Sequence, residues 1–132
     1  MELVVLPELL AVCLLPAGAT LPEWAQQNDL LAAIRDSDEL TIVCAQKFIP
    51  PGIQVERGWR ALKVRGPLEF SLIGVLAELS ARLAQAGVSI FALSTYSTDY
   101  ILVKDELLGR AIQALRSGGH VVHMNSPLDQ AG

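Results

Sequence analysis

A predicted helix in the C-terminal half begins with residues that have the clearest capacity to hold an anionic group. Ser71, Leu72 and Ile73 form its start, where backbone N–H groups have no partner within the helix. The helix dipole places positive potential at these amides, so a carboxylate gains about 0.3–2 kcal/mol there. Gly74 lets a ligand or a backbone approach closely. The simpler alternative is that Ser71 only caps the helix and Gly74 only packs.

Metal and nucleophile chemistry is disfavoured by the spacing of the histidines and cysteines. His120 and His123 stand three residues apart in a predicted strand, so their side chains point to opposite faces and do not chelate one ion. Cys13 and Cys44 lie in apolar runs without a basic neighbour in the sequence, which is typical of buried, unreactive thiols. We therefore expect no catalytic residue, no metal site and no cofactor, and hence no enzyme.

The elements that position these residues follow from the hydrophobic pattern. Residues 59–65 alternate apolar and polar side chains, which predicts a strand with one buried face. A helix is predicted over residues 71–86, because leucine and valine recur there at helical spacing, and Gly87 closes it. Glu69 and Ser71 are candidate capping residues at its start.

The remaining C-terminal elements complete one folding unit. Residues 88–95 and 100–104 predict two strands around a turn at residues 96–99, a helix over 105–117 follows, and 120–123 form a short last strand. The order is β-α-β-β-α-β. Each helix has one apolar stripe, so both must cover the same face of an antiparallel four-stranded sheet.

The first half of the chain reads as a shortened copy of the second. Residues 30–47 align with residues 90–107 at an offset of 60, as strand, polar turn and strand. A strand at 9–15 corresponds to the one at 59–65, and a helix of one or two turns is predicted near 21–26. We expect an α+β chain with a degenerate N-terminal unit at 1–57, a complete C-terminal unit at 58–124 and a flexible tail at 125–132. Residues 54–58 are the predicted join.

Composition narrows the class of protein. Of the 132 residues 52% are hydrophobic and 18% are charged, so most of the chain is expected to be folded. A net charge of −4 with scattered basic residues argues against nucleic-acid and membrane partners. The apolar run 9–15 resembles the apolar region of a signal peptide. A signal peptide has basic residues before that region, whereas here acidic residues and no basic residue precede it. We expect a cytoplasmic protein, with this run as a buried strand.

Two segments carry a family likeness. Residues 66–76 (GPLEFSLIGVL) and 86–103 (AGVSIFALSTYSTDYILV) strongly resemble the tandem ACT-domain proteins related to the CASTOR arginine sensors. Shorter matches at 10–13, 22–24 and 39–44 extend the resemblance over about residues 3–124. Residues 94–103 are the most specific part.

The resemblance implies paired ferredoxin-like βαββαβ units, regulation without catalysis and association as a homodimer. It also implies an amino-acid ligand at a junction of two units, near the loop after the first strand, the start of the first helix and the neighbouring strand. Glu69 and Asp99 are candidates for the ligand's amino group or a cationic side chain, although aspartate is also an ordinary turn residue. The full candidate set is Glu69, Phe70, Ser71, Leu72, Ile73, Thr95, Tyr96, Thr98 and Asp99.

Two functions remain open from the sequence. One is a sensor or regulatory protein that binds a small-molecule amino acid and acts on a protein target. The other is an interaction module that dimerises or docks on a partner through its open sheet face and binds no ligand. Three residues near the turn carry hydroxyl groups: Thr95, Tyr96 and Thr98. Their hydroxyl groups could line a ligand pocket, or the residues could be present only because their types are common in strands.

Overall fold

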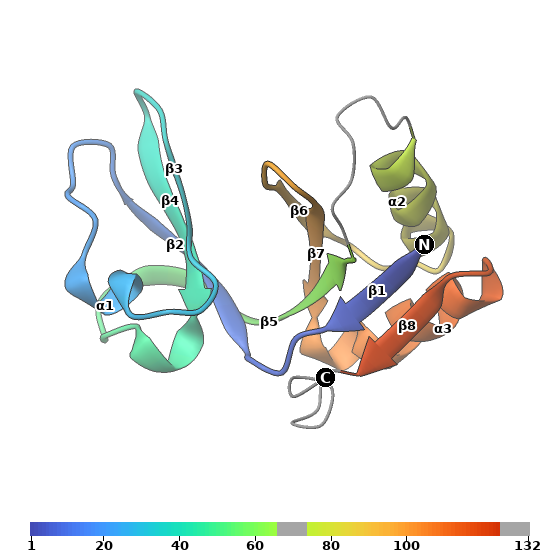
Figure 1. Ribbon diagram of the computed structural model, residues 1–132. Helices are drawn as coiled ribbons and strands as arrows, with labels where there is room; N and C mark the ends of the chain where they lie inside the picture. The colour runs from blue at the N-terminus through green and yellow to red at the C-terminus, as the bar shows by residue number, and fades with distance from the viewer. Residues whose placement is uncertain (66–73, 125–132) are drawn as a thin grey trace. The chain divides into compact units, whose positions relative to one another are not determined.

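The computed structural model describes residues 1–65 and 74–124, which form a mixed α+β fold (Figure 1). The predicted fold class is confirmed. The strands are β1 Glu2–Val5, β2 Leu10–Pro16, β3 Ala32–Arg35, β4 Glu39–Ala45, β5 Gln54–Val64, β6 Phe91–Ser94, β7 Asp99–Lys104 and β8 Val121–Met124. The helices are α1 Glu23–Gln26, α2 Val75–Gln85 and α3 Leu108–Ser117, with short 3-10 turns η1 Gln46–Phe48 and η2 Asp105–Leu107.

The C-terminal unit consists of Met1–Pro7 and the chain from Arg60 onward. Its strands follow the order β6-β7-β5-β1-β8, and β1 lies between β5 and β8 (Figure 1). β1 pairs antiparallel with β5 and parallel with β8. The helices α2 and α3 contact each other. Their buried side chains join one core with the inward side chains of the strands, among them Leu62, Leu79, Leu83, Ile101 and Leu115.

The N-terminal unit spans Glu8–Trp59. It has the strand order β3-β4-β2-β5, in which every neighbouring pair is antiparallel. A single helical turn, α1, contributes Ala25 to its core, together with Cys13, Ile42 and Cys44. This unit is smaller because its helices are only a turn long, as the adjacent Pro50 and Pro51 led us to expect for the second of them.

The predicted duplication appears in the elements themselves. β4 begins at Glu39 and β7 at Asp99, sixty residues later. Each of these strands is preceded by a short hairpin partner, β3 or β6, and followed by a 3-10 turn. The second turn continues into α3, whereas the first ends at Phe48, shortly before the two prolines. The copies therefore differ mainly in their helices.

The sheet of the C-terminal unit differs from the sequence-based expectation. Four strands were predicted, but β1 adds a fifth that the sequence pattern did not indicate. Residues 1–7 group with the C-terminal unit, and the division falls between Trp59 and Arg60, where 57/58 was expected. Residues 54–58, the predicted join, belong to the continuous strand β5. The fifth strand and the unit boundary depend on pairing between strands that are far apart in the sequence. The local periodicity of a segment does not indicate such pairing.

The predicted helices are present with adjusted ends. Gly74 precedes α2 in a left-handed conformation with φ 85°, and Gly87 follows it with φ 75°. A positive φ favours glycine at both positions. The predicted start at Ser71 is wrong: α2 begins at Val75, and its N-cap is Gly74, because the left-handed backbone at Gly74 cannot continue a right-handed helix. The tail 125–132 lies outside the described residues. Among the described residues, no helix has the length and apolar character needed to cross a membrane.

Candidate functional site

The turn between β6 and β7 is closed by a dense set of hydrogen bonds. The Thr95 N–H donates to the Thr98 carbonyl at 2.8 Å, and the Thr95 hydroxyl donates to the same oxygen at 3.1 Å. The Thr95 hydroxyl oxygen also accepts from the N–H groups of Ser97 at 3.3 Å and Thr98 at 3.1 Å. Threonine at this position thus fixes the turn through its side chain.

Thr98 ties this hairpin to the strand β5. Its side chain is buried, with 7% of the residue exposed, and its hydroxyl donates to the Val64 carbonyl. Val64 is the last residue of β5 and precedes the predicted ligand residues 69–73 by five positions in the sequence. The turn is therefore held beside the end of the strand that precedes those residues.

Asp99 is held by a residue outside the predicted set. Ser94 and Asp99 face each other as a cross-strand pair at the ends of β6 and β7. The Ser94 hydroxyl donates to Asp99 Oδ1 at 2.6 Å, a length typical of a bond to an ionised carboxylate. The sequence signal for Ser94 was its position opposite Asp99 across a four-residue turn, which becomes readable only once the hairpin register is known.

The structure brings together four of the predicted ligand residues. Thr95, Tyr96, Thr98 and Asp99 lie in one hairpin end, with the Thr98 hydroxyl engaged by Val64. Tyr96 is 82% exposed, so described residues do not enclose its ring in a pocket. The other five predicted residues lie outside the described part of the chain: Glu69, Phe70, Ser71, Leu72 and Ile73.

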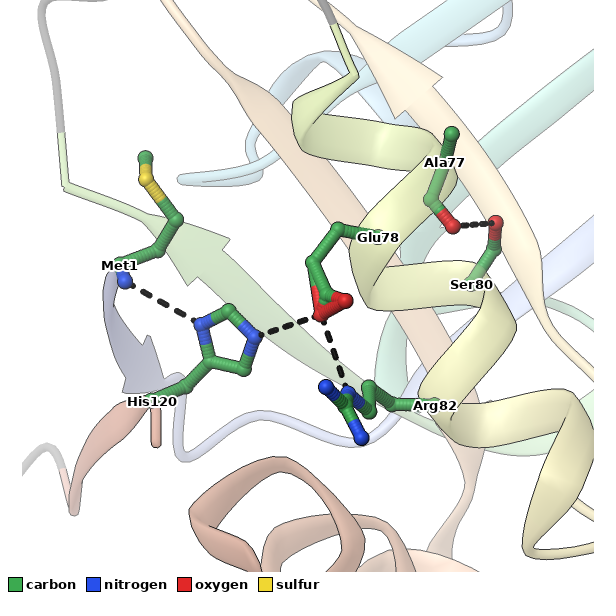
Figure 2. Close-up of polar contacts among 6 residues, drawn as sticks. All are labelled: Met1, Ala77, Glu78, Ser80, Arg82 and His120. Carbon is green, nitrogen blue, oxygen red and sulfur yellow. Dashed lines mark hydrogen bonds and ion pairs between the residues drawn. The ribbon is translucent and has the colours of Figure 1, made fainter. Parts of the chain in front are cut away.

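A second polar cluster joins α2 to the start of β8 in the C-terminal unit (Figure 2). The terminal ammonium of Met1 donates to His120 Nδ1 at 3.1 Å, so the ring proton lies on Nε2 and points to Glu78 at 3.2 Å. Arg82 Nε donates to the same Glu78 oxygen at 3.1 Å. Hydrogen bonds from Arg82 and His120 lower the pKa of Glu78. These polar groups satisfy one another, which indicates a structural cluster.

The cysteines are buried, as the sequence suggested, whereas His120 lies just before β8 and not inside the predicted strand 120–123. His120 contacts Glu78, whereas His123 lies 3.8 Å from Glu2, so the two rings have different partners. Cys13 and Cys44 are buried, and the hydrogen bond between the two thiols, together with burial, raises the pKa of Cys44 far above its ordinary value. No group of three metal-binding side chains occurs within residues 1–65 and 74–124.

One surface hollow lies away from the hairpin. It has a volume of about 630 Å³ and is lined by residues of α3, with Ile112 and Arg116 among them. None of the predicted ligand residues contributes to it. The hollow therefore offers no support for the predicted site.

The chain matches two family models. A model described as "ACT domain" matches residues 54–117, and a model of an N-terminal domain matches residues 8–52. Two curated relatives, cytosolic arginine sensor for mTORC1 subunit 1 of Homo sapiens and of Bos taurus, are each 34% identical over 59 residues. The match covers 44% of this chain and 18% of theirs, so the chain spans a small part of their length.

Solved structures resemble the chain over nearly its whole length. Protein Atu0741 from Agobacterium tumefaciens is 30% identical, with a TM-score of 0.89 and coverage of 95% of this chain and 93% of that one. VC0802 from Vibrio cholerae is 21% identical, with a TM-score of 0.73 and 88% of both chains covered. The regulatory subunit of aspartate kinase from Thermus thermophilus is 11% identical, with a TM-score of 0.63 and coverage of 87% and 95%. The last two likenesses concern the fold alone.

Proposed function

Because the chain belongs to the ACT-domain proteins related to the cytosolic arginine sensors, we propose that it is a regulatory protein that binds an amino acid and catalyses no reaction. The observation that carries the proposal is the half-buried carboxylate of Asp99 at the end of a hairpin with a fixed turn. A fixed carboxylate is suited to an ammonium or guanidinium group. The similarity to a cytosolic arginine sensor supports an amino acid as ligand.

The second half of the proposed site comes from the sequence. We propose that residues 69–73, which precede the Gly74 cap of α2 in the sequence, supply amides for the ligand's carboxylate, since a zwitterion needs donors and acceptors close to each other. The contact between Thr98 and Val64 supports this pairing, because it holds the hairpin beside the strand that leads into residue 66. Glu69 remains a predicted second carboxylate for the ligand's cationic group.

The proposed setting is that of a cytoplasmic homodimer that acts on a protein target. Those parts of the proposal rest on the resemblance to regulatory proteins.

One observation favours the alternative of an interaction module. Tyr96 presents an exposed aromatic ring on a turn that is already ordered, and such rings are common anchors of protein interfaces.

Thermal denaturation with each of the twenty amino acids tests the proposal. A ligand at 100 times its Kd stabilises the folded protein by about 2.7 kcal/mol, which raises the Tm by several degrees for a domain of this size. The expected result is a rise with one amino acid or with a small related group, and no rise with the others. The variant Asp99→Asn is the matched control, because it keeps the size and removes the charge.

The alternative function gives a different result. Twenty unchanged melting curves, together with a dimer in sedimentation velocity, would favour the interaction module. In that case Tyr96→Ala should weaken the self-association or the capture of a target, whereas Asp99→Asn should not.

A further inference from the structure

We infer that Ser94 is a positioning residue of the ligand site, because its hydroxyl fixes the Asp99 carboxylate in the orientation that receives the ligand's cationic group. The inference rests on the proposed function and adds to it a residue that makes no contact with the ligand. Ser94 acts on the ligand through its hydrogen bond to Asp99.

The geometry of the pair supports this role. Ser94 ends β6 and Asp99 begins β7, and the two residues are in direct register. The hydroxyl donates to Oδ1 at 2.6 Å, which fills one of the two acceptor positions of this oxygen. Within residues 1–65 and 74–124, the hydrogen bond from Ser94 is the side-chain contact of the Asp99 carboxylate, and it leaves the second oxygen, Oδ2, open. Oδ2 is thus the oxygen that keeps both acceptor positions for a ligand.

The surrounding turn is fixed by hydrogen bonds, so the orientation of the Asp99 carboxylate depends mainly on its own side-chain torsions. Thr95 holds the amides of Ser97 and Thr98, and Thr98 is anchored to Val64. The backbone of the hairpin end is fixed by these bonds, and the torsions of the Asp99 side chain are the remaining freedom. The Ser94 hydroxyl restricts them. A carboxylate that is already oriented loses less conformational entropy when the ligand binds.

The simpler explanation is that the pair only stabilises the hairpin. That explanation predicts a lower Tm for Ser94→Ala with an unchanged affinity for the ligand. A positioning role predicts a loss of affinity, of about threefold to tenfold for one restraining hydrogen bond. The loss must also vanish when Asp99 no longer carries a charge.

The experiment is a double-mutant cycle measured by isothermal titration calorimetry. The four proteins are the full chain, Ser94→Ala, Asp99→Asn and the double variant, titrated with L-arginine or with the amino acid that gives the largest Tm rise in the panel of twenty. Ser94→Thr keeps the hydroxyl and should restore most of the affinity. Ser97→Ala, on the same turn, is the control that should leave the affinity unchanged.

Each outcome decides the inference. Support requires weaker binding by Ser94→Ala, rescue by Ser94→Thr and no further loss when Ser94→Ala is added to Asp99→Asn. If Asp99→Asn weakens binding but Ser94→Ala does not, the inference falls and the proposed function stands. Additive losses in the double variant would also overturn it, because Ser94 would then act independently of Asp99. If the unaltered chain binds no amino acid, the proposed function and the inference fail together.

Discussion

The Thr98 hydroxyl donates a hydrogen bond to the Val64 carbonyl, 34 positions earlier in the chain. This bond links the β6–β7 hairpin to the end of β5, five positions before the predicted ligand residues 69–73 in the sequence. A buried hydroxyl without a partner is costly, so this contact specifies one placement of the hairpin. The proposed site depends on that placement.

Replacement of Thr98 tests the anchor. Thr98→Val has a similar shape and removes the hydroxyl, which leaves the Val64 carbonyl without this donor. We expect the free energy of unfolding to fall by about 1–3 kcal/mol in urea denaturation. Thr98→Ser keeps the donor and should lose less. An equal loss in the two variants would show that the methyl group, and not the hydrogen bond, stabilises the hairpin.

Removal of the charge at Asp99 tests the ligand contact. Asp99→Asn should weaken the binding of a cationic amino acid such as L-arginine by about tenfold or more, because a hydrogen bond to a charged group is lost. The Tm without ligand should change little, since the amide oxygen still accepts from Ser94. Calorimetry measures the affinity, and an unchanged Kd would remove Asp99 from the site.

The Glu78 cluster makes stability depend on pH. Hydrogen bonds from Arg82 and His120 lower the pKa of Glu78 in the folded state, so its contribution is present above the unfolded pKa of about 4.3. It is lost as the pH falls through the lower folded pKa. Glu78→Gln should therefore reduce the Tm at pH 7, and its difference from the unaltered protein should shrink below about pH 4.

A matched acid controls the Glu78 measurement. Glu106 is exposed in η2, and Glu106→Gln removes the same charge without the Arg82 and His120 contacts. Its Tm should follow that of the unaltered protein across the pH range. If both variants respond alike, the pH dependence comes from net charge and not from the cluster.

The two thiols are expected to be inert in the folded protein. Cys13 and Cys44 are 1% and 0% exposed, so a reagent does not reach either sulfur in the folded protein. Their mutual hydrogen bond lowers the pKa of Cys13 and raises that of Cys44, so the expected inertness rests on burial. A thiol reagent such as DTNB should label neither residue in buffer and both in urea, as counted by mass spectrometry. Rapid labelling of the native protein would indicate that the N-terminal core opens readily.

Local pattern was sufficient for most of the secondary structure. The apolar stripe of α2 includes Leu79 and Leu83, and both are fully buried. The polar turns of the two copies recur sixty residues apart, at Glu39 and Asp99, where β4 and β7 begin. Periodicity and turn chemistry are properties of neighbouring residues, and the sequence displays them directly.

The candidate site was predicted only in part. Asp99 and the hydroxyl residues of the hairpin were identified from the family likeness, but Ser94 was not. Its role depends on the register that sets it opposite Asp99. Register is a property of two strands together, and one strand alone does not contain it.

By itself, the sequence determined the α+β class, the duplicated element order and the positions of the turns. The tertiary structure decided that Glu2 pairs with Val121, 119 positions away, and that the chain's first strand therefore completes the C-terminal sheet. It also decided that Thr98 reaches Val64. Such contacts form only when distant segments pack together, and their stabilisation must offset the entropy lost on closing a long loop. Local sequence propensity does not indicate which distant segments pair.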